Sequence, residues 1–181
     1  MQGRVFVESI IHIPHELFLP AETAHYEGEL DYPLLKAGPD IYTFSEPLLW
    51  RVDITNTGEA FLLQGEVEGT GTTSCARCGN PAEVDLFGEL EGYYLISEED
   101  ADLEDAEGDE YELLPESHDI DLLPLVQAAL LLDVPYDPLC KDDCLGLCLK
   151  CGANLNEEAC TCSSDYIDPL SPFAALKDLK I

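Results

Sequence analysis

Basic residues are scarce in this chain, and their scarcity limits the partners that its surface can bind. The 181 residues include eight Lys and Arg against 38 Asp and Glu, which gives a formal net charge of −30 at pH 7. Proteins bind nucleic-acid phosphates largely through Lys and Arg, so this composition disfavours extended contact with RNA or DNA. It favours a basic partner, although an acidic surface also serves solubility alone.

Long apolar runs are also absent. No stretch approaches the roughly 18 apolar residues of a membrane-spanning helix, and the longest apolar run, within residues 122–132, is interrupted by Pro124 and Gln127. The segment 1–6 lacks the apolar core of a signal peptide. The sequence therefore predicts a cytoplasmic protein that does not associate with membranes. Because thiols stay reduced in the cytosol, its eight cysteines are interpreted as metal ligands before disulfides.

Recognisable catalytic motifs are missing as well. The sequence contains no H-E-x-x-H, no G-x-S-x-G, no P-loop and no G-x-G-x-x-G. A catalytic zinc usually has histidine among its ligands, whereas His12, His15, His25 and His118 lie far in sequence from the cysteines. We therefore expect no enzymatic activity.

What the sequence does contain is β-type alternation in its middle third. Apolar and polar residues alternate over 47–54 and again over 61–68, and a third such run extends from about 83 to 96. Gly65, Gly69 and Gly71 fall on the apolar side of the second run, which indicates a bend or a close neighbour. The pattern predicts an antiparallel meander with the first cysteine pair at the turn between its second and third strands.

The flanking regions are less regular. Residues 4–13 favour a first strand, after which four prolines break up any long element. Asp121 is the expected N-cap of a helix at 122–132 that is apolar on nearly all sides and therefore buried. The acidic stretch 98–112 is expected to be a solvated loop, and Ser171-Pro172 to start a short helix whose docking face is Phe173, Leu176 and Leu179.

Together these patterns predict an α+β fold in two parts. Residues 1–135 form a mainly antiparallel β meander with the buried helix near 121–132. Residues 136–181 form a zinc-ribbon-like, cysteine-rich module whose short C-terminal helix packs back on it.

The cysteine spacing indicates one or two zinc ions. Zinc prefers four thiolates in a tetrahedron, and a C-x2-C turn supplies two of them from one tight loop. A complete set occurs within fifteen residues, and a second C-x2-C turn has its natural complement further along the chain. The two expected sets are Cys148, Cys151, Cys160 and Cys162, and Cys75, Cys78, Cys140 and Cys144.

Other assignments of the cysteines stay open at this point. Cys140 or Cys144 can instead join the compact set, and four thiolates also suit iron–sulfur ligation. A thioredoxin-like redox pair needs a C-x-x-C that opens a helix after a strand, which the expected position of Cys75 and Cys78 between two strands does not provide.

Several of these features together resemble one protein family. They are Gly65 followed by Cys75-Ala76-Arg77-Cys78, Asp121-Leu122 at the helix start, the stretch 143–156 with its G-L-C-x-x-C-G-x-N-L-N core, Cys160-Thr161-Cys162, and residues 171–179. Over roughly residues 45–181 the chain resembles the bacterial YceD family of large ribosomal RNA subunit accumulation proteins. The resemblance implies a role in accumulating large-subunit (23S) ribosomal RNA, gene proximity to a small zinc-ribbon ribosomal protein, and no established enzyme activity.

Residues and resemblance together favour a non-enzymatic, zinc-binding ribosome biogenesis factor. Its acidic surface suits a basic ribosomal protein or a pre-ribosomal particle better than naked RNA. Arg77, Lys141 and Lys150 lie beside cysteines and are candidates either for a small RNA contact or for neutralising thiolates. Two alternatives remain, an RNA-binding zinc-knuckle module and a thiol redox protein that uses Cys75 and Cys78.

Overall fold

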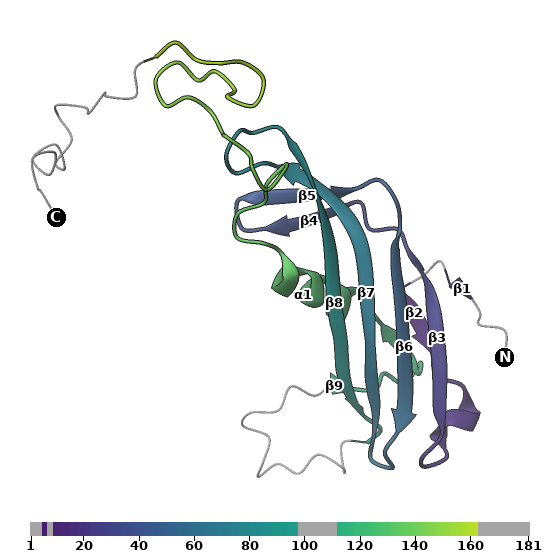
Figure 1. Ribbon diagram of the computed structural model, residues 1–181. Coiled ribbons are helices and arrows are strands. Elements are labelled where there is room, and N and C mark those ends of the chain that lie inside the picture. Colours follow the sequence, from purple (N-terminus) through teal and green to yellow (C-terminus); the bar gives the residue numbers. More distant parts are fainter. Residues whose placement is uncertain (1–4, 7–8, 98–111, 163–181) are drawn as a thin grey trace, which may run out of the picture.

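A long curved sheet dominates the molecule, as the computed structural model of residues 5–6, 9–97 and 112–162 shows (Figure 1). The elements in chain order are β1 (Val5–Phe6), β2 (Ile10–His12), the 3-10 helix η1 (His15–Phe18), β3 (Thr23–Leu30), β4 (Leu34–Ala37), β5 (Asp40–Phe44), β6 (Leu48–Asn56), β7 (Ala60–Ser74), β8 (Pro81–Leu95), β9 (Glu112–Leu113), β10 (Asp119–Asp121) and α1 (Leu123–Asp133). The predicted α+β class, mainly antiparallel with one helix, is confirmed.

Strand β7 organises the sheet. One edge pairs with β8 along its full length, from Ala60 opposite Leu95 to Ser74 opposite Pro81. The other edge pairs with β6 and, further along, with the end of β5. β3 pairs with β6 and β4 with β5, whereas the short strands β1 and β9 add parallel pairs at β3 and β8. The predicted meander of three strands is β6–β7–β8, and its final hairpin spans about 50 Å.

The core lies on one face of this sheet. Alternate residues of β6, β7 and β8 point to that face, where α1 and the small β10–β2 sheet cover them (Figure 1). The largest fully buried side chains are Tyr42, Phe61, Ile11, Ile13, Leu35, Leu48, Ile54, Leu63, Leu86, Leu90, Ile120 and Leu122. One-sided burial of this kind is the physical reason for the period-two pattern in the sequence.

Glycines allow close approach at two places in this packing. A Cβ at Gly65 would overlap the Arg51 carbonyl and the Val52 side chain. The close neighbour that the sequence pattern indicates at Gly65 is therefore β6. A Cβ at Gly88 of β8 would lie 2.7 Å from the Ala129 Cβ, so this glycine lets α1 rest directly on the sheet.

The helix is less buried than its composition indicates. Val126, Ala129 and Leu130 are buried, but Leu132 is 90% exposed and Leu123 and Leu131 lie partly in solvent. The expectation of burial on nearly all sides is therefore wrong, because α1 covers the sheet with one face only. Asp121 is also not the N-cap. The N-cap residue is Leu122, and Asp121 precedes it as the last residue of β10. The Asp121 carboxylate still accepts a hydrogen bond from the Leu123 N–H (3.0 Å).

The N-terminal region contains more strand than expected. Instead of one strand at 4–13 the described residues form the separate strands β1 and β2. Residues 23–44, where only proline breaks were expected, form β3, β4 and β5. The acidic stretch from 98 to 111 and the predicted helix at 171–179 lie outside the described residues.

Candidate metal centres

The first cysteine pair lies at the tip of the β7–β8 hairpin. The Cys75 carbonyl accepts the Gly79 N–H (2.9 Å), and the Cys75 N–H bonds to the Asn80 carbonyl (2.8 Å). This tight loop requires a positive φ at Gly79, which is +74°. It turns Cys75 and Cys78 toward the same point, as the position between two strands predicts.

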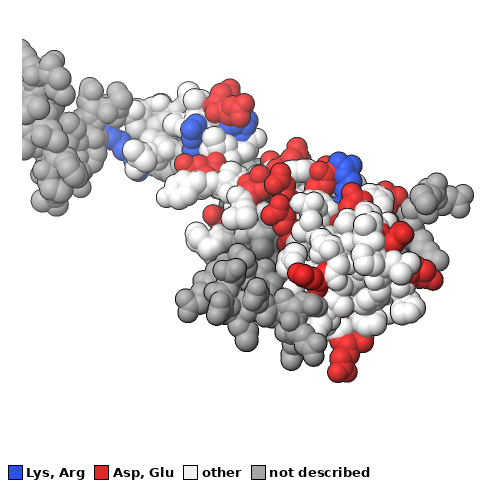
Figure 2. Space-filling model, turned by 90° about the horizontal axis from the view of Figure 1, so that it is seen from below, with Lys and Arg blue, Asp and Glu red and all other residues white. Residues whose placement is uncertain are grey.

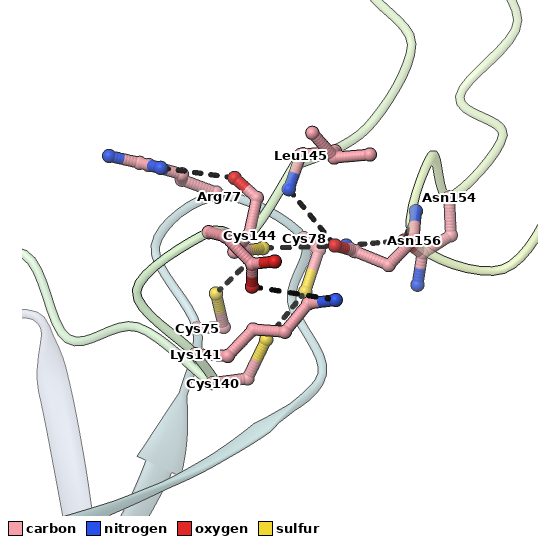
Figure 3. Close-up of polar contacts among 10 residues, drawn as sticks. Cys75, Arg77, Cys78, Cys140, Lys141, Cys144, Leu145, Asn154 and Asn156 are labelled. Atoms are coloured by element: carbon pink, nitrogen blue, oxygen red, sulfur yellow. Dashed lines mark hydrogen bonds and ion pairs between the residues drawn. The ribbon is translucent and has the colours of Figure 1, made fainter.

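The segment after α1 brings a second pair to this tip (Figure 3). The Ala76 N–H bonds to the Pro138 carbonyl (2.8 Å), and the Arg77 guanidinium donates to the Cys144 carbonyl (3.0 Å). The Sγ atoms of Cys75 and Cys144 are 3.8 Å apart, and those of Cys78 and Cys140 are 3.6 Å apart. These four residues, Cys75, Cys78, Cys140 and Cys144, are called the hairpin group below.

The remaining cysteines form a second set with a matching loop. The Cys148 carbonyl accepts the Gly152 N–H (2.8 Å), and the Cys148 N–H bonds to the Ala153 carbonyl (2.8 Å). Gly152 has a φ of +73°, close to the +74° of Gly79 in the first loop. Cys160 lies 3.3 Å from Cys148 and 3.5 Å from Cys151, sulfur to sulfur. This set, Cys148, Cys151, Cys160 and Cys162, is called the C-terminal group.

In each group, the sulfur positions fit one tetrahedrally coordinated ion. Zinc–sulfur bonds of about 2.3 Å at tetrahedral angles place sulfur atoms about 3.75 Å apart. The sulfur atoms within each group all lie within 4.8 Å of one another. The separations of 3.8, 3.6 and 3.5 Å given above are near the tetrahedral value, and the Cys148–Cys160 separation of 3.3 Å is shorter. All eight cysteines are free thiols. Each group can therefore hold one metal ion through four soft ligands.

Local hydrogen bonds favour the thiolate form of cysteines in both groups. Burial raises the pKa of the Cys75 thiol, but hydrogen bonds from the backbone of Cys140, Arg77 and Cys78 outweigh it and lower the pKa to about 6. In the C-terminal group, the backbone N–H groups of Cys151 and Lys150 lower the pKa of Cys148 to about 6. These turn amides favour the charged sulfur that a metal binds.

The two groups differ in their surroundings. Cys75, Cys78 and Cys144 are each at most 5% exposed and form a small buried cluster with Ala82, whereas Cys151 is exposed. The hairpin group joins parts of the chain more than sixty residues apart, since its closest pairs are separated by 62 and 69 positions. It ties the sheet to the segment after the helix, whereas the C-terminal group closes a local loop.

A polar residue that sequence reasoning did not single out connects the groups. The Asn156 amide nitrogen donates to the Cys144 Sγ (3.4 Å), and its amide oxygen accepts the Leu145 N–H (2.9 Å) (Figure 3). The available signal was its place in the N-L-N stretch of the family resemblance. Asparagine is so common in turns that the residue type alone does not indicate this contact.

The cations beside the cysteines have partners within the chain. Arg77 donates to the Cys144 carbonyl, and the Lys141 ammonium lies 3.7 Å from the Asp143 carboxylate. These contacts stabilise the cysteine loops, and the RNA contact or thiolate neutralisation expected of these cations stays a prediction. Among the described residues, no helix is long and apolar enough to cross a membrane.

The fold and site define a β-sheet protein in which a long hairpin and the chain after its covering helix share a tetracysteine group, with a second such group beyond. A family model described as "Large ribosomal RNA subunit accumulation protein YceD" matches residues 63–180. The chain belongs to this family, as the sequence resemblance predicts.

Curated relatives agree with this assignment. The chain is 30% identical over 152 residues to "Large ribosomal RNA subunit accumulation protein YCED homolog 1, chloroplastic" of Zea mays, covering 70% of this chain and 52% of the relative. The protein of the same name from Arabidopsis thaliana is 26% identical over 153 residues, 70% of this chain and 47% of that protein. This chain thus spans about half the length of these relatives. An uncharacterized protein of Mycobacterium tuberculosis is 28% identical over 147 residues, 80% of this chain and 67% of that protein. No solved structure matches.

Proposed function

We propose that this protein is a non-enzymatic factor for the accumulation of large-subunit ribosomal RNA, held together by one structural zinc ion in each tetracysteine group. Membership of the YceD family supports the link to ribosomal RNA. The geometry of the two groups supports the metal. We further propose that it acts in the cytoplasm, where thiolates remain available to bind zinc.

The single observation that carries the structural role is the completeness of both ligand sets. Four thiolates fill the coordination shell of zinc, whereas a catalytic zinc keeps a position open for water or substrate. Each group supplies four sulfur atoms from the chain itself. The proposed ions therefore act as cross-links, and the surrounding surface carries the function.

The surface supports a basic protein partner. Figure 2 shows one face of the molecule, on which acidic side chains are spread widely and Lys and Arg are few. The solvent side of the sheet is acidic as well, and Arg51 is the one Lys or Arg in strands β3, β6, β7 and β8. The acids on that side are Glu27, Glu29, Asp53, Glu66, Glu68, Glu83, Asp85, Glu89 and Glu91.

Pairing within the sheet leaves part of this charge uncompensated. Arg51 forms an ion pair with Glu66, but Glu66 also lies directly opposite Glu89 across the β7–β8 pair. Like charges in directly opposed positions destabilise a sheet. A basic ribosomal protein, or a pre-ribosomal particle that displays one, would relieve this repulsion.

Metal content tests the structural half of the proposal. Elemental analysis of protein purified without added metal should find two zinc ions per chain, one for each group. Iron in place of zinc would mean that the groups are iron sites. A metal-free protein that is folded and supports the accumulation of ribosomal RNA would refute the structural role.

Loss of the gene tests the ribosomal half. We expect deletion to lower the ratio of 23S to 16S ribosomal RNA, and the wild-type gene to restore it. A variant with Cys140→Ser and Cys160→Ser, one ligand from each group, should restore it poorly. An unchanged ratio in the deletion strain would contradict the proposed role.

Charge neutralisation tests the partner. Glu66→Gln with Glu89→Gln should weaken capture of ribosomal proteins from a dissociated large subunit, and added salt should weaken capture by the wild-type chain. Glu116→Gln with Glu158→Gln removes the same charge from exposed positions outside these strands and serves as the control. Equal capture by both double variants would exclude the sheet face as the docking surface.

A further inference from the structure

Asn156 belongs to one cysteine group by sequence and contacts the other in space. It lies between Cys151 and Cys160, in the loop that the C-terminal group closes. Its amide nitrogen donates to the Sγ of Cys144, which is a member of the hairpin group (3.4 Å). The same amide thus connects the loop of one group to a ligand sulfur of the other.

The orientation of this amide is fixed from both sides. The Leu145 N–H donates to its oxygen (2.9 Å), which determines which end faces the sulfur. On its own loop, Asn154 accepts hydrogen bonds from both the backbone N–H (3.1 Å) and the amide nitrogen (2.9 Å) of Asn156. Asn154 in turn donates to the Glu157 carboxylate (2.8 Å). These hydrogen bonds therefore fix the orientation of the Asn156 amide independently of its contact with the sulfur.

Backbone contacts also join the loop that carries Asn156 to the residues that follow Cys144. The Leu155 N–H bonds to the Gly146 carbonyl (2.9 Å), and Leu147 and Asn154 form an isolated antiparallel bridge. Gly146 has a φ of +74°, and a Cβ there would lie 3.1 Å from the Arg77 carbonyl at the hairpin tip. Residues 154–156 are thus joined to the segment that follows Cys144, and that segment lies against the hairpin tip at Gly146.

We infer that Asn156 is a positioning residue that couples metal binding at the two groups. This rests on the proposed function, because it requires a metal ion in each group. An N–H that donates to a ligand sulfur orients the ligand, and such outer contacts alter metal affinity by about 10–100-fold. Metal in the C-terminal group orders the loop that holds Asn156 and so strengthens binding at the hairpin group. The coupling is reciprocal, since linkage between two binding equilibria acts equally in both directions.

Two substitutions separate this contact from general folding. Asn156→Asp keeps an oxygen for the Leu145 N–H but loses the donor to Cys144 and places a carboxylate beside the thiolate. Asn156→Ala removes both contacts. Glu158→Ala is the matched control, because Glu158 is an exposed residue of the same loop.

The readout is the full chain loaded with ¹¹³Cd, a zinc substitute whose NMR signal reports each four-sulfur site separately. We expect both Asn156 variants to shift the hairpin-group signal, and chelator competition to show affinity there about 10–100-fold weaker. Glu158→Ala should leave the signal and the affinity unchanged. If the hairpin-group affinity and signal in Asn156→Asp equal those of the wild type, the positioning role is refuted.

A double-mutant cycle tests the coupling itself. Cys160→Ser opens the C-terminal group, and we expect it to weaken metal binding at the hairpin group about tenfold or more in the wild-type background. In the Asn156→Ala background the same change should have little further effect, because the connection is already lost. Equal effects in both backgrounds would overturn the inference while leaving the proposed zinc sites intact. Failure of either group to bind any metal would instead refute the proposed function.

Discussion

Replacing Cys140 with Ser removes one ligand from the hairpin group, and the structure allows its cost to be compared with that of Cys160→Ser in the C-terminal group. Both cysteines are half-buried, so the cost of placing a hydroxyl at each position is similar. The two changes differ in the loop that the metal closes. Cys78 and Cys140 are 62 positions apart, whereas Cys151 and Cys160 are nine apart.

Loop length sets the expected magnitude. A cross-link restricts the unfolded chain, and the chain-entropy relation gives about 4 kcal/mol for the longer loop and about 2.5 kcal/mol for the shorter one. The longer loop also contains β8 and α1, so its closure stabilises the sheet itself. Cys140→Ser should therefore lower the free energy of unfolding of the sheet by about 4 kcal/mol, while Cys160→Ser acts mainly on its own loop.

Urea unfolding followed by the fluorescence of Trp50, the single tryptophan and a core residue, measures this difference. With a slope of about 2 kcal/mol per molar urea, Cys140→Ser should lower the midpoint of the zinc-loaded protein by about 2 M. Cys160→Ser should lower it by less than about 1 M. In excess chelator both variants should unfold as the wild type does. Equal midpoints for the two zinc-loaded variants would refute the assignment of the hairpin group as the main cross-link of the sheet.

Three further predictions address packing, pH and RNA. Gly88→Ala places a Cβ against Ala129 and should cost about 1–3 kcal/mol by displacing α1, which thermal unfolding measures; an unchanged melting temperature would contradict the close packing. Burial, and to a smaller extent the charges of Glu112 and Asp121, raise the pKa of Tyr94 to about 12. The neutral phenol therefore stabilises the fold below pH 10, and this contribution is lost between pH 10 and 12. Tyr94→Phe should remove that part of the alkaline loss in urea titrations at several pH values, and an identical decline would refute it. The isolated protein should bind 23S ribosomal RNA weakly at physiological salt, whereas tight binding with a steep salt dependence would favour the RNA-binding alternative.

The three central strands were predictable because burial on one face imposes a strict alternation. Leu48, Trp50, Val52 and Ile54 occupy every second position of β6 and are all buried. In β3 the corresponding inward positions hold Ala24, Tyr26 and Gly28 before Leu30, and small or partly exposed residues weaken the signal. Prolines on both sides made this segment resemble a loop, although they only mark its ends.

The helix shows a different limit of sequence patterns. A run rich in leucine predicts a helix in contact with the core, but it does not determine which leucines face water. Leu130 and Leu132 are close in sequence, yet one is fully buried and the other is 90% exposed. The difference is set by the position of β8 beneath α1, which depends on contacts that are distant in sequence.

The cysteine groups were predictable for a chemical reason. Four thiolates around one ion must fit a narrow range of distances, so the spacing of C-x2-C turns limits the possible sets. The pairing of Cys75 and Cys78 with Cys140 and Cys144 could be given only as the natural complement, because it depends on where α1 returns the chain. The role of Asn156 could not be predicted, since a hydrogen bond from an amide to a sulfur requires no particular spacing in the sequence.

The separation of the hairpin group along the chain also has a consequence for biosynthesis. Cys75 and Cys78 are complete as a pair once the β7–β8 turn has formed, but Cys140 is synthesised 62 residues after Cys78. At ordinary elongation rates of about 5–20 residues per second, the two thiols wait roughly 3–12 s for their partners. During that interval a nascent chain presents half of a metal site at the end of its longest hairpin. The order of synthesis therefore makes the arrival of metal at the hairpin group a late event, after most of the sheet has been made.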